Sequence, residues 1–434
     1  MKKQYVKWLA AELPDLVARN ILSPDAADRL RDYYGGFDQD ARRHLAANAF
    51  AILAALLIGS GIILLLAHNW AELSRPARAV ISFLPLLAAQ ALAGWGLGRG
   101  KDSRGWKEGV SIFWMLAIGS SLALVSQTYH ISSDPETFTL SWMLLSIPIV
   151  YLLGSGSINL LYLIGITVWA GMARSAGGHP AFFWLLIALP LPRIWKIGRH
   201  DPYRTEPGLL RAVFTICLII GTGIILNKSL ADYWIVIFSS LFALTYLAGR
   251  IWFADAPPRV FLQPLRAIGG TGILFLAFSA SFRGPWKEII RYNRPLLQPE
   301  IIPALILPAG VVALLLLCRS RSRGSGSLLG VMPLLALAAT ILARTTGWMI
   351  PINIVLFTAY IFILGLANLL HGIKERNIGL INLGLVILCL LIVVRFFDSD
   401  LGFTVRGVAF IVTGIGFLLA NFILLQKKAT DRQK

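Results

Sequence analysis

About fourteen apolar runs, each of a length that can cross a lipid bilayer as a helix, follow one another along this 434-residue chain. A hydrocarbon core of ~30 Å needs about 20 helical residues to span it, and helices satisfy their own backbone hydrogen bonds there. Hydrophobic residues make up 56% of the chain and charged residues 14%, which is more apolar surface than one water-soluble core can bury. The sequence therefore predicts an all-α, polytopic integral membrane helix bundle with about fourteen transmembrane helices.

The predicted bundle occupies residues 49–426 and lies between two polar segments. Residues 1–48 predict a small cytoplasmic helical cap, in which Ser23 is the N-cap of the second helix and Pro24 its first residue. Residues 427–434 predict a basic cytoplasmic tail. The predicted spans are residues 49–67, 79–97, 110–128, 139–154, 158–173, 181–195, 209–226, 232–249, 266–282, 300–318, 328–343, 351–370, 378–394 and 403–425.

Lys and Arg residues are distributed unevenly between the alternate gaps of these spans. With the N-terminus inside, the inner segments hold 29 of the 40 Lys and Arg residues. Because short cytoplasmic loops are enriched in these residues, we expect both termini in the cytoplasm. The net charge of +18 then reflects topology and contact with anionic headgroups, so membrane lipids are the expected partners and nucleic acid is not.

Two predicted outer hairpins carry arginines that this rule does not explain. In the first hairpin, Pro76 opens the second span and places Arg78 in its first turn, where the helix dipole disfavours a cation. The carboxylate of Glu72 would relieve that repulsion. In the last hairpin, Asp400 precedes Arg406 by the same six residues. Two interpretations remain open: salt bridges that hold each hairpin together, or a cationic lining of a shared pocket.

The gap after the third span contains polar and acidic groups but no basic residue. If this gap lies beside the two hairpins, it adds carboxylates and a titratable imidazole to an outward-facing polar pocket. The candidate ligand-binding residues of this pocket are Arg78, Glu72, Trp70, Gln127, Tyr129, His130, Asp134, Arg395, Asp398 and Arg406.

Residues 283–294 mix aromatic side chains, isoleucines and cations. This composition is typical of a segment that lies in the outer interface, and it places Trp286 and Tyr292 at headgroup level. The alternative is a lid or a site for lipid headgroups.

Catalytic and metal-binding spacings are missing from the sequence. Cys217, Cys318 and Cys389 lie far apart in apolar runs, and His68 and His130 belong to no HxxxH or HExxH pattern. We therefore expect no catalytic residue, no metal and no cofactor, and an embedded enzyme ranks third among the functions considered. Ionisable residues are almost absent from the middle of the spans, which argues against an ion-coupled carrier and leaves a lipid flippase or a facilitative carrier open.

Several short motifs give residues 5–155 a family resemblance. They are Leu22-Ser-Pro-Asp25-Ala-Ala-Asp-Arg29-Leu30, Gly59-Ser-Gly-Ile-Ile-Leu-Leu-Leu-Ala-His-Asn69-Trp70, Arg75-Pro-Ala-Arg78 and Gln127-Thr-Tyr129-His130. With these motifs the chain resembles a bacterial multi-pass membrane family, domain of unknown function 2157. The resemblance implies a multi-pass protein of the bacterial inner membrane, and it brings no activity, substrate or catalytic residue.

Two functions fit these observations. The favoured one is binding or translocation of an anionic or lipid-linked envelope component through the outward-facing pocket, with its arginines as the cationic lining. The alternative is a non-catalytic membrane scaffold. It would recruit a cytoplasmic protein partner through residues 1–40 and a periplasmic partner through the outer loops.

The orientation is tested by single cysteines at positions 72, 134 and 400. We expect all three to react with a membrane-impermeant thiol reagent in intact cells, because the distribution of cations places these loops outside. Labelling of all three only after lysis would reverse the predicted orientation.

Overall fold

A computed structural model gives the structure of the chain over the ranges that follow, and every structural statement below concerns these residues. The described residues are 13, 16–17, 21–30, 70, 72–100, 103–131, 134–200, 205–226, 232–253, 263–291, 301–321, 328–346, 350–396, 404, 407, 411 and 415. By its internal contacts the chain divides into two units, Met1–Ile81 and Ser82–Lys434, which are described separately.

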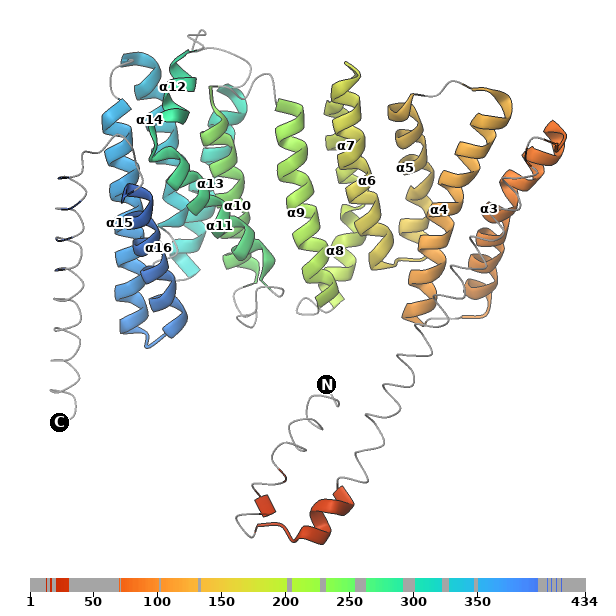
Figure 1. Cartoon of the computed structure of the whole chain (residues 1–434), viewed down its shortest axis with the longest axis horizontal. Coiled ribbons are helices and arrows are strands. Elements are labelled where there is room, and N and C mark those ends of the chain that lie inside the picture. The colour runs from red at the N-terminus through yellow and green to blue at the C-terminus, as the bar shows by residue number, and fades with distance from the viewer. Residues whose placement is uncertain are drawn as a thin grey trace. The chain divides into compact units, whose positions relative to one another are not determined.

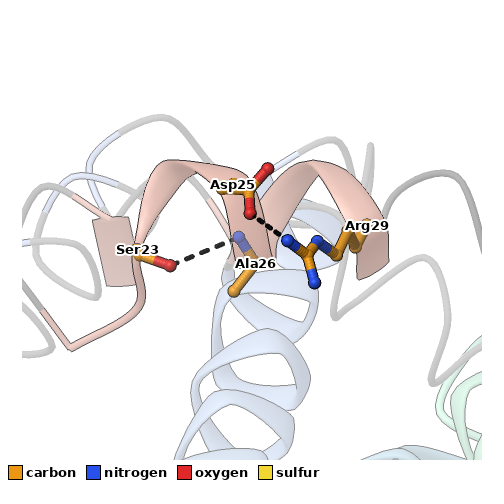
Figure 2. Close-up of polar contacts among 4 residues, drawn as sticks. All are labelled: Ser23, Asp25, Ala26 and Arg29. Carbon is orange, nitrogen blue, oxygen red and sulfur yellow. Dashed lines mark hydrogen bonds and ion pairs between the residues drawn. The ribbon is translucent and has the colours of Figure 1, made fainter.

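In the first unit, residues 24–30 form a short helix whose start was predicted from the sequence. The hydroxyl oxygen of Ser23 accepts a hydrogen bond from the backbone N–H of Ala26 at 3.3 Å, which confirms Ser23 as the N-cap (Figure 2). One turn further on, Asp25 and Arg29 form an exposed ion pair with a separation of 2.5 Å. Such an exposed i, i+4 pair adds little to stability.

The rest of the described chain is helical, with no strand in the described ranges. Consecutive helices of the second unit run up and down beside one another, as in Figure 1. The boundary between the units falls within α3. The helices are α3 (Arg75–Gly98), α4 (Arg104–Tyr129), α5 (Pro135–Leu152), α6 (Gly156–Ser175), η1 (Pro180–Phe182), α7 (Phe183–Ala188), α8 (Leu191–His200), α9 (Thr205–Leu226), α10 (Trp234–Trp252), α11 (Pro264–Ala280), α12 (Arg283–Arg291), α13 (Ile301–Arg321), η3 (Leu329–Val331), α14 (Met332–Thr346), α15 (Ile350–Lys374) and α16 (Ile378–Phe396).

Nine helical segments in the described part are long and apolar enough to cross a membrane. The pair α11 and α12 passes the same test together but bends by 75° at the residues between them, and a tenth crossing results if this pair is one span. Each predicted span from 79–97 to 378–394 coincides with helical structure. Helices α5 and α13, which correspond to the predicted spans 139–154 and 300–318, are not among the segments that pass this test. The first predicted span and nearly all of the last lie outside the described residues, so the total of fourteen stays a prediction.

The second unit contains two clusters of buried apolar side chains. The first joins helices from α3 to α9 and has Tyr162 and Trp169 among its largest buried members. The second joins α10 to α16 and includes Tyr233, Trp286 and Phe357. Helix α9 packs on both α10 and α11, so the two clusters meet there.

Close helix contacts in the second cluster depend on glycine. A Cβ on Gly384 of α16 would lie 2.6 Å from the backbone nitrogen of Leu369 and 2.7 Å from the carbonyl oxygen of Gly365, both on α15. These two helices therefore touch through their backbones, which is how small residues replace the hydrophobic driving force between helices in lipid.

Replacing Gly384 with alanine is expected to lower stability by about 1–3 kcal/mol, because a methyl group at this point forces two backbones apart. The matched control is Gly94→Ala in α3, where a Cβ meets nothing within 4 Å. There we expect no loss, or a gain of up to ~1 kcal/mol from the better helix propensity of alanine. Thermal unfolding of both variants in the same detergent measures the difference, and equal melting temperatures would contradict the close contact.

Candidate functional site

In the second unit, α4 ends, α5 begins and α12 lies at the same end, which we call the α12 end (Figure 1). This is the end predicted to face outward. At this end α4 finishes with Gln127, Tyr129 and His130, whose side chains are all exposed. His130 is the C-cap in the left-handed conformation, with φ of 53°. Asp134 is the N-cap of α5, although its side chain makes no capping hydrogen bond.

The first unit contains three further residues of the predicted pocket. Arg78 lies in the first turn of α3, and its Nε donates a hydrogen bond of 2.9 Å to the carbonyl oxygen of Leu73. Glu72 is exposed, whereas Trp70 is partly buried. Asp398 and Arg406 lie outside the described residues. The proposed sharing of one pocket by the two hairpins therefore stays a prediction.

Arg395, in the last turn of α16, is the sequence-predicted residue with the clearest contacts. One of its terminal nitrogens, Nη2, lies 2.6 Å from the carbonyl oxygen of Ser281, just past the end of α11, and 2.6 Å from the Thr358 hydroxyl of α15. The guanidinium carbon also lies 5.8 Å from the centre of the Phe282 ring. Arg395 thus joins three helices at the α12 end, and the contacts account for an arginine at the end of an apolar span.

A second cation at this end was not recognised in the sequence as part of a site. Arg344, in the last turn of α14, has Nη1 at 3.5 Å from Oδ2 of Asp232, which stands just before α10. Their side chains are only 5% and 3% exposed. The guanidinium of Arg344 also lies over the ring of Tyr233, 5.0 Å from its centre. A buried acid and a buried base are thus placed together where water is largely excluded.

Two uncharged polar residues accompany this ion pair. Thr340 is one turn before Arg344 on α14, so both lie on the same face of that helix. Asn353 of α15 donates from Nδ2 to the carbonyl oxygen of Ala339 at 3.2 Å, which brings it to the same turn of α14. We call Asp232, Arg344, Thr340 and Asn353 the buried polar cluster.

Helix α12 lies beside this cluster, against α14 and α15. We expected Trp286 to anchor this segment in the lipid interface, but its ring is fully buried in the protein. The indole N–H donates to the carbonyl oxygen of Ala280 at 2.7 Å, and the ring centre is 5.7 Å from that of Phe357. Phe357 is one turn along α15 from Asn353, so α12 packs next to the buried polar cluster.

The opposite end of the unit has interhelical polar contacts of its own, among them one made by Glu108. The carboxylate of Glu108 in α4 accepts hydrogen bonds of 2.9 Å from the backbone N–H groups of both Gly156 and Ser157, while Ser155 caps the same helix from within. A carboxylate on the N-terminus of α6 satisfies donors that have no partner inside that helix. Within the described ranges, no group of three or more His, Cys, Asp or Glu side chains is arranged to hold a metal ion.

Together, the apolar helices of crossing length and the buried charges at their ends define a multi-pass helical membrane protein. Residues 14–159 match the model of a family described as a predicted membrane protein, domain of unknown function 2157. This match covers about a third of the chain and confirms the resemblance found in the sequence. No curated protein and no solved structure matches the chain.

Substitution of Thr358 by valine tests the contact with Arg395. We expect a loss of about 1.5–3 kcal/mol, because the change removes an acceptor from a charged donor in a partly buried position. The control is Thr345→Val in α14, an exposed threonine whose hydroxyl bonds only to its own helix. Thermal unfolding in detergent gives both values, and a similar small loss in the two variants would show that Arg395 does not depend on Thr358.

Proposed function

We propose that the protein resides in the bacterial inner membrane with both termini in the cytoplasm, and that it binds an anionic group of an envelope component at the α12 end. The uneven distribution of cations supports this orientation, since 29 of 40 lie in the segments predicted to be inside. In this orientation the α12 end faces away from the cytoplasm. A ligand carrying a phosphate or carboxylate, either free or linked to lipid, has the chemistry that arginines at this end would recognise.

The observation that carries the proposal is the two-sided character of α12. Its buried face holds Trp286 and Ile289, which fix the helix to the bundle. Its exposed face holds Arg283, Lys287 and Arg291, each four residues from the next and therefore in one row. An amphipathic helix of this kind, lying at a membrane interface with a row of cations facing away from the protein, favours anionic headgroups.

Translocation is the stronger form of the same proposal. The 75° bend between α11 and α12 resembles the broken or re-entrant segments that carriers use to bring polar groups into the membrane. The sequence-predicted residues Arg78, Arg395 and Arg406 remain candidates for the ligand path.

The scaffold alternative would use the N-terminal segment to dock a protein partner. The short helix at residues 24–30 exposes its polar side chains and is preceded by Ile21, which is 65% exposed. One exposed apolar residue is common on protein surfaces and does not by itself mark a docking site. This alternative requires no ligand at the α12 end.

Binding is tested by titrating purified full-length protein in neutral detergent with phosphatidylglycerol, and with phosphatidylcholine as the uncharged comparison. We expect phosphatidylglycerol to raise the melting temperature by about 2–6 °C, because a ligand that binds only the folded state stabilises it. The triple variant Arg283→Gln, Lys287→Gln, Arg291→Gln should lose most of this shift.

The matched control removes the same number of exposed cations from the opposite end, with Lys196→Gln, Lys374→Gln and Arg376→Gln. This variant should keep the shift. If both triple variants lose the melting-temperature shift equally, the shift depends on the net charge of the protein and not on a site at the α12 end. The scaffold alternative would then be preferred.

A further inference from the structure

A shallow hollow lies at the end of the second unit opposite to the α12 end, where α9 begins, α10 ends and α11 begins. It has an open volume of about 170 Å³ and is lined by Arg211, Gly249, Phe253, Gln263, Pro264, Leu265 and Arg266. Two of these described lining residues are arginines, and none of them is an acid. The hollow therefore presents positive charge at one end of two helices that are long and apolar enough to cross a membrane, α9 and α10.

Arg266, in the first turn of α11, is fixed in the hollow by three hydrogen bonds. Its Nε donates to the carbonyl oxygen of Gly249 at 3.1 Å and its Nη2 to that of Phe253 at 3.0 Å, so it satisfies carbonyl groups at the C-terminus of α10. Its Nη1 donates to Oε1 of Gln263 at 3.1 Å. All three acceptors are uncharged groups, so these bonds hold the guanidinium in place without neutralising its charge.

Arg211, in the second turn of α9, is placed in the hollow by a different interaction. Its guanidinium carbon lies over the ring of Phe253, 4.1 Å from the ring centre, and its side chain is partly exposed. Cation–π attraction of this kind uses none of the N–H donors of the guanidinium. Two arginines from different helices, α9 and α11, are thus held beside each other around one aromatic ring.

The position of the hollow along the helices favours a lipid headgroup as its ligand. Trp252, the last residue of α10 and the neighbour of Phe253, is 64% exposed. An exposed Trp at the end of a membrane-crossing helix is typical of the level at which lipid headgroups lie. On α11, Leu265 of the hollow lies on the same side of the helix as Ile268 and Phe275, and Phe275 is 69% exposed. A lipid whose headgroup occupies the hollow can lay an acyl chain along this side.

The shape and charge of the hollow fit the phosphate of such a headgroup. A shallow, open site takes up the phosphate alone and leaves the rest of the lipid in the bilayer. Arginine presents a planar set of N–H donors that matches the oxygens of a phosphate group. Basic pockets between membrane helices are a common means of binding anionic headgroups.

We propose that this hollow binds the phosphate of an anionic phospholipid in the leaflet opposite to the α12 end, with Arg211 facing the ligand and Arg266 as a fixed second cation. In the orientation proposed above, this is the cytoplasmic leaflet. The site is separate from the anion binding proposed for the α12 end and does not depend on it. A lipid bound here joins α9 to α10 and α11, where the two clusters of buried apolar side chains meet.

The test uses a phosphatidylglycerol analogue that carries a photoreactive diazirine near its headgroup, added to purified full-length protein in neutral detergent. After illumination, mass spectrometry of the peptides locates the cross-linked residues. We expect labelling within residues 205–211, 249–253 and 263–266 that is about fivefold stronger than with the matching phosphatidylcholine analogue, because one arginine near the surface favours an anionic lipid by about this factor.

Substitutions in the hollow should change this preference in a graded way. Arg211→Gln removes the cation that faces the ligand and should make labelling by the two lipids nearly equal. Phe253→Leu keeps both arginines but removes the aromatic face, and it should reduce the preference about twofold. The matched control, Lys196→Gln, removes an exposed cation of α8 outside the lining and should keep the wild-type preference. If Arg211→Gln does not fold, the preference of the wild-type protein and its reduction in Phe253→Leu decide the question.

Three results would overturn the inference. Equal labelling of the wild-type hollow by both lipids would show contact with lipid but no recognition of an anion. An equal loss of preference in Lys196→Gln and Arg211→Gln would assign the preference to the overall charge of this end. Displacement of the photoreactive lipid by dimethyl phosphate as effectively as by unlabelled phosphatidylglycerol would show that the site takes a soluble phosphodiester and would reject a lipid site. None of these results decides the proposed function, because cross-links within residues 283–291 of the same samples report on the α12 end separately.

Discussion

A charge enclosed by apolar helices is tolerated only when a partner is enclosed with it, because an unpaired buried ion costs several kcal/mol. This requirement decides how both ends of the second unit are built. At the α12 end, Arg344 lies beside Asp232, and Arg395 contacts the carbonyl oxygen of Ser281. At the opposite end, the carboxylate of Glu108 accepts from the first N–H groups of α6. Each contact joins separate helices, so these polar groups help to fix the arrangement of the bundle at its two ends.

Local patterns predicted the helices well because each helix is encoded within its own residues. Apolar runs marked the spans, and Ser23 before Pro24 marked a helix start. Partners of buried charges could not be predicted in this way. Asp232 and Arg344 are about 110 residues apart, and each stands at the edge of an apolar run as an interfacial residue would. Arg395 was among the candidate pocket residues, but its contact with the backbone carbonyl of Ser281 could not be predicted from the pattern of side chains. Trp286 was assigned to the interface because a single sequence does not show which face of an amphipathic helix meets protein.

Helix α12 has a row of cations on its exposed face, and its buried face lies next to the buried polar cluster. Its outer face can attract anions over roughly a Debye length, about 8–10 Å in physiological salt, with little geometric selectivity. The residues near its inner face, including Phe357 and Asn353 one turn apart on α15, lie where the dielectric constant is low and geometry matters more. Attraction and discrimination would then be divided between the two sides of one nine-residue helix. Helix α12 can have one face toward the outside and one toward the protein because it does not continue in the direction of α11, from which it is bent by 75°.

The glycines between α15 and α16 differ in what surrounds them, and this difference bears on how the sequence can change over evolution. A Cβ on Gly365 would meet the side chain of Leu388, at 2.8 Å, so a smaller residue at position 388 could make room for it. A Cβ on Gly384 would meet the backbone of α15, which every residue type shares. Position 365 can therefore vary together with position 388 in related sequences, whereas position 384 has no compensating partner and can change only if the two helices move apart.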